Sequence, residues 1–237
     1  MKLDLAGTNK MIKRTYPDGY IREFPNFYDT MIHHYSKEER NTMYWIAKNA
    51  RPDWVSIDVG AHIGEYTMLL NHYCPDGITY AFEAHATTYE MLKKNLAYHK
   101  IDQCVEAFNI AVGDEKGTRE TWLMFAGPSG FGEKIGIYDF TTLDFFVNEH
   151  KVPRVDFIKI DVDGWDLEVL AGAQALIEKY HPVIIIEINK HLEQRKHTER
   201  EFLNFAGGNG YTLRALDYSK SGNWLCLPIA KGPALCV

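Results

Sequence analysis

The sequence has few cysteines and no apolar run long enough to cross a membrane. Its four cysteines form neither a CxxC pair nor a zinc-ligand spacing, so a structural zinc site is not expected. The first residues lack the apolar core of a signal peptide. Apolar runs such as residues 182–186 have the length of a strand, whereas a membrane span requires about 20 residues. These absences predict a cytoplasmic protein with reduced thiols and no membrane span.

Positive charge is also scarce. The chain has 26 Lys and Arg against 32 Asp and Glu, and its formal net charge is −6. Because a nucleic-acid partner normally requires a basic face, none is expected. One basic cluster alternates with acidic residues and is predicted to be a solvated helix face; it comprises Arg195, Lys196, His197 and Arg200, interleaved with Glu193, Glu199 and Glu201. No feature indicates the oligomeric state.

From residue 51 onward, short apolar strands alternate with helices. We expect strands at 54–59, 78–82, 105–112, 155–160 and 183–188, and helices at 65–73, 86–99, 167–176 and 199–205. This alternation predicts a doubly wound α/β fold with a mostly parallel sheet covered on both faces. Two closing strands, at 211–216 and 223–229, have no helix between them and predict an antiparallel C-terminal edge.

Two segments fall outside this alternation. Residues 1–50 are polar and aromatic, with a turn at 17–19 and a helix from Ser36 to Ala50 that begins with a capping box formed by Ser36 and Glu39. We predict that they form a separate N-terminal segment, a candidate substrate lid, before a domain at 51–237. Within 115–142, a strand-like stretch at 121–125 precedes a glycine-rich loop at 126–132, which is either a second candidate lid or an exposed connection without a role.

The most informative motif follows the first strand. Asp58 ends the apolar stretch 55–59, and the chain then turns through Gly60 and Gly64 into a helix. In a doubly wound sheet, ligands bind at this carboxyl end of a strand. The spacing is D-x-G-x-x-x-G, not the G-x-G-x-x-G of a dinucleotide site, and the Asp58 carboxylate repels a pyrophosphate. The motif therefore favours a cationic or zwitterionic ligand such as S-adenosylmethionine.

The ends of the next two strands add residues to this predicted cofactor site. Glu83 lies about 20 residues beyond the glycine turn, where an acidic residue accepts hydrogen bonds from ribose hydroxyls. Asn109 and Ala111 lie at the end of the third strand, and the small Ala111 leaves room for an adenine ring. A turn that serves only the chain reversal is an equal interpretation of this third segment.

Further carboxylates follow the fourth and fifth strands. Asp161 and Asp163 come after the apolar stretch 157–160, and Asp161 is expected to face the same cleft as Asp58. Glu187 lies within the apolar strand 183–188, where a carboxylate is costly unless it is paired or borders a site. A helix-capping role for Asp163 and an internal hydrogen-bond role for Glu187 are the structural alternatives.

Taken together, these segments resemble the FkbM-type methyltransferase family. The resemblance rests on SIDVGAHIGEYT, ITYAFEAH, FNIAVGD, TTLDFF, DFIKIDVDGWDLEVLAGA and PVIIIEIN, in the family's order, over roughly residues 50 to 190. The family usually has Glu where this chain has Asp163, and Pro where it has Ala84. The resemblance implies a Rossmann-like class I methyltransferase that uses S-adenosylmethionine to methylate a hydroxyl of a sugar or a related small molecule.

The resemblance also assigns residues. Asp58, Gly60, His62 and Gly64 match the glycine loop, Glu83 the ribose-binding acid, Ala111 the adenine side, and Asp161 a carboxylate near the methionine part and the acceptor. An unactivated hydroxyl requires a general base or a metal. The candidates for a catalytic role are Asp161, Glu187 and His191, with Asp161 or His191 as the base. Alternatively, Asp161, Glu187 and Asn189 form an oxygen-donor set that suits Mg²⁺ or Mn²⁺.

Three other functions share parts of this pattern. A nicotinamide-dependent oxidoreductase has the same fold but needs a third glycine. A methyltransferase of nucleic acid or protein shares the cofactor, but the acidic balance argues against nucleic acid. A binding module that retains only the pocket is disfavoured by the intact carboxylates.

Overall fold

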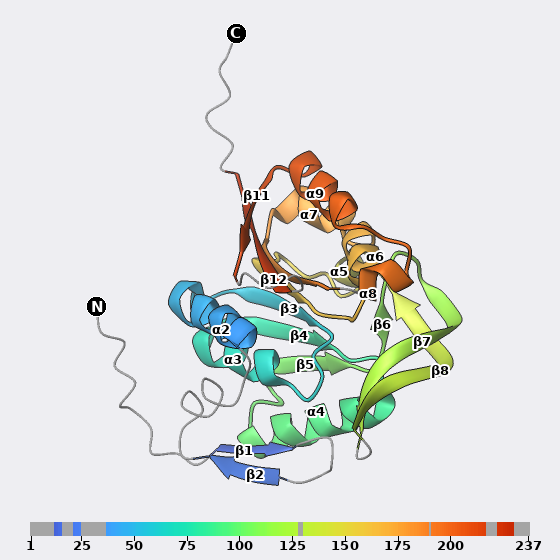
Figure 1. Ribbon diagram of the computed structural model, residues 1–237. Coiled ribbons are helices and arrows are strands. Elements are labelled where there is room, and N and C mark those ends of the chain that lie inside the picture. The colour runs from blue at the N-terminus through green and yellow to red at the C-terminus, as the bar shows by residue number, and fades with distance from the viewer. Residues whose placement is uncertain are drawn as a thin grey trace.

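A seven-stranded sheet forms the centre of the computed structural model, which describes residues 12–15, 21–24, 37–127, 130–189, 191–216 and 222–229 (Figure 1). The strand order is β11-β12-β10-β9-β3-β4-β5. Five strands of this sheet are parallel, namely β3 (Val55–Val59), β4 (Ile78–Phe82), β5 (Val105–Phe108), β9 (Phe157–Ile160) and β10 (Val183–Ile188). The hairpin of β11 (Tyr211–Ala215) and β12 (Gly222–Pro228) adds an antiparallel edge. The predicted doubly wound fold is confirmed.

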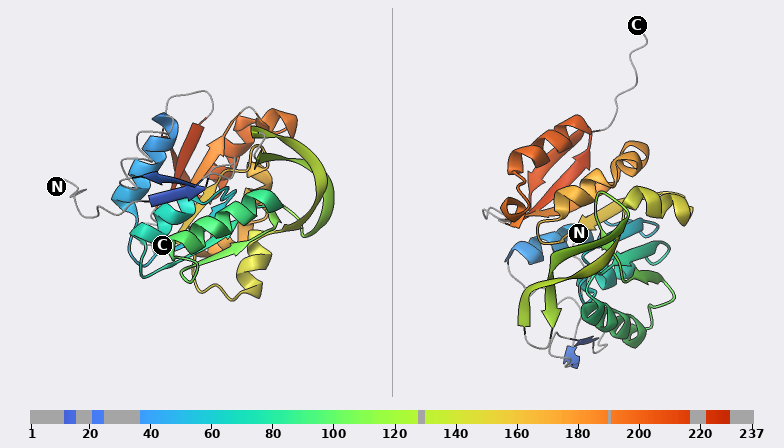
Figure 2. Two further views of the ribbon diagram at one scale, coloured as in Figure 1. Left: turned by 90° about the horizontal axis from the view of Figure 1, so that it is seen from below. Right: turned by 90° about the vertical axis from the view of Figure 1, so that its right-hand side faces the viewer.

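Helices cover both faces of this sheet (Figures 1 and 2). One face packs against α2 (Lys37–Asn49), α3 (Glu65–Tyr73) and α4 (Ala86–His99). The other packs against α5 (Leu143–Glu149), α6 (Asp166–Ala171), α7 (Gln174–Tyr180) and α9 (Glu199–Gly208). The short α8 (His191–Gln194) directly follows β10.

The two faces of the central strands differ in chemistry. Towards α5–α7 the strands present an aliphatic layer, which comprises Ile57, Val59, Ile158, Ile160, Ile184 and Ile186. On the opposite face, the register pairs Asp58 on β3 with Lys159 on β9, and both are buried. Because side chains alternate along a strand, Asp161 and Glu187 lie on this polar face as well. The fold therefore brings these charged groups together at the carboxyl edge of the sheet.

The region between β5 and α5 differs from the sequence prediction. The strand predicted at 105–112 divides, because β6 (Ala111–Val112) leaves the central sheet and pairs with β8 (Gly130–Thr141). The predicted loop at 126–132 is also wrong: the antiparallel pairing of β7 (Gly117–Gly127) with β8 continues to residues 127 and 130, and residues 128–129 lie outside the described parts. The result is a long hairpin that arches beside the sheet (Figure 2).

The helix predicted at 167–176 is divided into α6 and α7. Between these two helices, Gly172 packs closely on the residue that follows β6. A Cβ on Gly172 would lie 2.0 Å from the carbonyl oxygen of Gly113. Glycine is therefore required at this contact, and the helix is interrupted there.

In the N-terminal segment, β1 (Ile12–Thr15) and β2 (Ile21–Phe24) form an antiparallel hairpin, with β1 beside α4 (Figure 1). The predicted helix is confirmed as α2, whereas its predicted cap Ser36 and the turn at 17–19 lie outside the described residues. The lid role of residues 1–50 stays a prediction. Within the described residues, no helix combines the length and apolarity that a membrane crossing would need.

Candidate active site

The predicted glycine turn joins β3 to α3 and adopts left-handed backbone conformations. Gly60, His62 and Gly64 have φ of 81°, 53° and 100°. A Cβ on Gly60 would lie 1.9 Å from the carbonyl oxygen of Asp161, and one on Gly64 would lie 2.7 Å from a methyl group of Leu92. Both glycines are therefore needed for packing. Gly60 lets the turn pass close to the end of β9, and Gly64 lets it pass close to α4. The left-handed, non-glycine His62 is a strained position of the kind found at functional sites.

Glu83 joins the loop after β3 to the loop after β4 through its two carboxylate oxygens. Its Oε2 accepts a hydrogen bond from the backbone N–H of His62 at 2.9 Å, and its Oε1 accepts one from the N–H of His85 at 2.9 Å. Burial raises the pKa of Glu83, and the two N–H donors partly offset that effect. Each carboxylate oxygen has a second lone pair, so Glu83 can support the loops and still accept a ligand hydroxyl.

The residues predicted for the adenine side, Asn109 and Ala111, contact other residues of the protein. The Asn109 side-chain amide donates to the carbonyl oxygens of Glu83 and Ala84, at 2.8 and 3.1 Å. Ala111 begins β6 and is buried in an apolar cluster with Leu123, Phe140 and Trp165. Asn109 therefore shapes the loop after β4. A direct contact of either residue with a cofactor remains a prediction.

Asp58 is fully buried beneath the glycine turn. The Thr67 hydroxyl on α3 donates to its Oδ2 at 2.5 Å. Burial raises the pKa of Asp58 to about 6, although Thr67 and the ammonium of Lys159 act in the opposite direction. Asp58 is thus coupled to the start of α3 and to the charges on β9.

Lys159 is a central residue of the site that the sequence analysis overlooked. Its side chain is 0% exposed, and its Nζ lies 2.9 Å from Oδ2 of Asp161, which is 28% exposed. The ammonium also lies 5.1 Å from the centre of the Tyr66 ring. A lysine inside the otherwise apolar strand FIKI is the signal that could have revealed it, because a buried ammonium requires an anionic partner. Lys159 thereby gives Asp161 a fixed cationic partner.

Glu187, Asn189 and His191 do come together at the end of β10. The Asn189 amide donates to Oε2 of Glu187 at 2.6 Å, and the backbone N–H of His191 donates to Oδ1 of Asn189 at 2.8 Å. The His191 ring lies 3.5 Å from the side-chain oxygen of Gln194. Burial, reinforced by the charge of Asp161, raises the pKa of Glu187 to about 9. Both effects favour the protonated form of Glu187.

This arrangement gives no support to the predicted metal site. The Asn189 oxygen that would bind a metal already accepts a hydrogen bond, and Glu187 would have to lose a proton first. In addition, the described part of the chain contains no cluster of three or more His, Cys, Asp or Glu side chains suited to a metal ion.

The raised pKa of Glu187 predicts how the stability of the folded chain depends on pH. The folded side chain keeps its proton up to about pH 9, whereas the ordinary pKa is 4.5, so unfolding releases a proton between these values and is favoured as the pH rises. The stability contribution is complete below about pH 4.5 and is lost towards pH 9. Glu187→Gln should therefore melt several degrees above wild type at pH 8, with a smaller difference at pH 5, as measured by calorimetry. Glu178→Gln, on the exposed face of α7, is the matched control; a Glu187→Gln variant that melts below wild type at pH 8 would contradict the prediction.

The loop after β9 is held by Asp166, a second residue that the sequence analysis did not identify. Asp166 is fully buried, and its two oxygens accept the N–H groups of Val162 and Gly164, at 3.1 and 2.9 Å. Burial raises its pKa to about 7. Asp163, for which a capping role was considered, makes no such contact and has a left-handed φ of 50°. Asp166 thus fixes the turn from which Asp163 projects.

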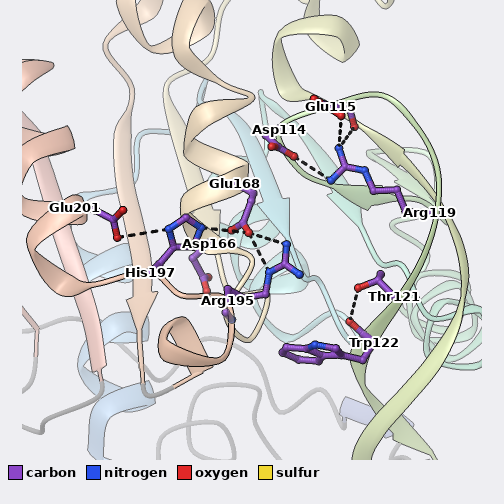
Figure 3. Close-up of polar contacts among 11 residues, drawn as sticks. Asp114, Glu115, Arg119, Thr121, Trp122, Asp166, Glu168, Arg195, His197 and Glu201 are labelled. Carbon is purple, nitrogen blue, oxygen red and sulfur yellow. Dashed lines mark hydrogen bonds and ion pairs between the residues drawn. The ribbon is translucent and has the colours of Figure 1, made fainter.

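Beyond the loop after β9, Glu168 forms ion pairs with Arg195 and His197 (Figure 3). The guanidinium of Arg195 lies 3.5 Å from the centre of the Trp165 ring, and it donates to Oε1 of Glu168 at 2.8 and 3.0 Å. His197 lies 3.3 Å from the same oxygen. The predicted solvated helix face is therefore wrong for Arg195 and His197, although Lys196 and Arg200 are exposed. Arg119 on β7 pairs with Asp114 and Glu115 (Figure 3).

The strand order, the antiparallel β12 and the acidic carboxyl edge define a Rossmann-like methyltransferase fold. The chain belongs to the FkbM methyltransferase family, because the family model described as "Methyltransferase FkbM domain" matches residues 58–213. The resemblance inferred from the sequence motifs is thereby confirmed. No curated protein matches the chain closely enough to count as a relative.

Solved structures share this fold at low identity. Methyltransferase FkbM from Methylobacillus flagellatus KT has a TM-score of 0.57 and 18% identity, with 78% of this chain and 47% of that chain covered. The chain thus spans about half the length of that relative. Precorrin-6y C5,15-methyltransferase from Geobacter metallireducens GS-15 has a TM-score of 0.51 and 12% identity, with 83% and 92% covered. A Streptococcus mutans protein, solved in complex with SAH, has a TM-score of 0.51 and 11% identity, with 81% and 97% covered.

Proposed function

We propose that this protein is an S-adenosylmethionine-dependent O-methyltransferase that acts on a hydroxyl of a sugar, a glycan or a related small molecule. The observation that carries this proposal is the acidic carboxyl edge of the sheet within a chain of the FkbM methyltransferase family. Asp58, Glu83 and Asp161 line the ends of three neighbouring strands there.

The chemistry of these residues suits the cofactor. S-adenosylmethionine has a sulfonium, an ammonium and one carboxylate, whereas NAD has a pyrophosphate that the same carboxylates would repel. Asp161, which pairs with Lys159, would face the cationic methionine part, and Glu83 would accept ribose hydroxyls with its remaining lone pairs. The bound cofactor supplies an electrophilic methyl group. The work left to the protein is to align the acceptor oxygen with that group and to accept a proton.

The choice of a hydroxyl follows from the family resemblance and from the buried acid–base groups. A hydroxyl is a poor nucleophile at neutral pH, and the site has several carboxylates whose environments differ in charge and burial. The aromatic N-terminal segment, residues 1–50, is proposed to cover the acceptor as a lid. Nucleic acid and protein acceptors are the alternative substrates.

Cofactor binding is the first prediction of this proposal. Isothermal titration should show micromolar-range affinity for S-adenosylmethionine and much weaker binding of NAD, because the glycine turn adjoins carboxylates. Tight binding of NAD without binding of S-adenosylmethionine would contradict the proposed function.

The acceptor is tested with methyl-labelled S-adenosylmethionine and a panel of methyl glycosides, small alcohols, RNA and protein. Label should appear in methyl ethers of the sugars, identified by mass spectrometry and NMR of the product. Methylation only at nitrogen or carbon, or only of RNA or protein, would replace the proposed acceptor class.

A further inference from the structure

The carboxyl groups at the edge of the sheet differ in how fully they are engaged. Among the described residues, five of these groups already accept a donor: Asp58 from the Thr67 hydroxyl, Glu83 from two backbone N–H groups, Asp161 from Lys159, Asp166 from two backbone N–H groups, and Glu187 from the Asn189 amide. Asp163 has no hydrogen bond or ion pair to another residue of the described parts. It is half-buried and follows the carboxyl end of β9.

The surroundings of Asp163 suit a group that accepts a proton. His62, His191 and Asp161 lie close enough to Asp163 to interact with it electrostatically, so Asp163 stands between the loop after β3 and the start of α8. A carboxylate that accepts no hydrogen bond from the protein keeps its lone pairs available for the proton of an acceptor hydroxyl. Asp161, by contrast, already has the Lys159 ammonium at 2.9 Å, and Glu187 already accepts the Asn189 amide at 2.6 Å.

The backbone presents Asp163 rigidly. Its φ of 50° is a left-handed conformation, and the turn is held by the two hydrogen bonds to Asp166. On the other side, a Cβ on Gly164 would lie 2.7 Å from the carbonyl oxygen of His191, so α8 packs tightly against the same turn. Such a strained residue persists only where its surroundings hold it in place.

We propose that Asp163 is the catalytic base of this enzyme, an inference that rests on the proposed O-methyl transfer. The acceptor oxygen forms the new C–O bond to the methyl group while the C–S bond breaks with its electron pair going to sulfur. The hydroxyl proton passes to a carboxylate oxygen of Asp163 and is later released to water. The products are the methyl ether, S-adenosylhomocysteine and one proton. Asp161 then serves as the fixed negative charge that faces the cationic cofactor.

The test compares Asp163→Asn with Asp163→Glu in the full chain, using labelled S-adenosylmethionine and the panel of methyl glycosides. Asparagine keeps the shape, tolerates the left-handed backbone and removes the base. Turnover should fall at least ~100-fold, with the affinity for S-adenosylmethionine within about threefold of wild type by titration and the melting temperature unchanged. Asp163→Glu restores a carboxylate and should retain turnover within about tenfold of wild type. Asp114→Asn, which removes a carboxylate already paired with Arg119, is the matched control and should keep wild-type turnover.

The outcomes separate this inference from the proposed function. If wild type transfers methyl groups to sugars and Asp163→Asn does so equally well, the base assignment is wrong while the function stands. If the variant melts far below wild type, Asp163 supports the loop and the assignment is wrong as well; this result does not depend on an acceptor. If wild type methylates only nitrogen or carbon, the proposed function fails, and with it the need for this base.

Discussion

Asp161→Asn should lower turnover at least ~100-fold, because a preorganised charge of the site is lost. It should also destabilise the folded chain. The variant keeps the shape of the side chain but removes the anion that lies 2.9 Å from the buried Nζ of Lys159. Removing one partner of a buried ion pair costs roughly 3–5 kcal/mol, and the partial exposure of Asp161 favours the lower end of that range. The affinity for S-adenosylmethionine should fall too, because the charge facing the cationic cofactor is lost. Steady-state kinetics, titration and thermal melting measure the three effects.

A double variant separates the two roles of Asp161. In Lys159→Met/Asp161→Asn the buried ammonium is also removed, so the melting temperature should recover relative to Asp161→Asn while turnover remains low. Glu90→Gln is the matched control for a lysine–carboxylate pair: Glu90 and Lys93 lie 3.0 Å apart, but their side chains are 58% and 48% exposed, so little change is expected. Near-wild-type turnover of Asp161→Asn would show that Asp161 only supports the sheet edge.

The predicted metal is tested by adding EDTA to the wild-type protein. Because the Asn189 oxygen already accepts a hydrogen bond and burial favours the protonated form of Glu187, we expect EDTA to leave wild-type activity unchanged. Activity lost to EDTA and restored by Mg²⁺ or Mn²⁺ would favour the metal model and argue against a carboxylate base.

Glu83→Ala should weaken the binding of S-adenosylmethionine by about 10- to 150-fold. The predicted ribose hydrogen bonds are charge-assisted and contribute on the order of 1.5–3 kcal/mol. The variant should still fold, but with a lower melting temperature, because the N–H groups of His62 and His85 lose their acceptor. Titration of the folded variant measures the first effect, and calorimetry measures the second.

Asn95→Ala is the matched control for Glu83. The Asn95 amide on α4 donates to the carbonyl oxygen of Ile63 at 2.7 Å and so holds the same loop from beneath. Its removal should lower stability while leaving the affinity of the folded protein close to wild type. If Glu83→Ala binds the cofactor normally once folded, Glu83 holds the loops and does not contact the ribose.

The sequence by itself determined the parallel core and its edge. Strand 78–82 and helices 65–73 and 86–99 have the predicted bounds, because each has the apolar period of its element and a turn or glycine at its end. The acidic ends of the strands could be predicted for the same reason, since all parallel strands of a sheet end at one edge. The family motifs lie within these local elements, and they were sufficient to identify the family.

Tertiary structure alone decided how the charges are paired. Which carboxylate meets Lys159, which accepts backbone N–H groups, and which has no partner depends on the register between β3, β9 and β10 and on the turn held by Asp166. The same holds for the hairpin of β7 and β8, whose glycine-rich stretch 126–132 suggested a loop: cross-strand pairing overrides the weak strand preference of glycine. Burial and pairing depend on residues far apart in the chain, whereas periodicity reports only on neighbours, and for this reason the roles of Lys159, Asp163 and Asp166 could be argued only from the folded structure.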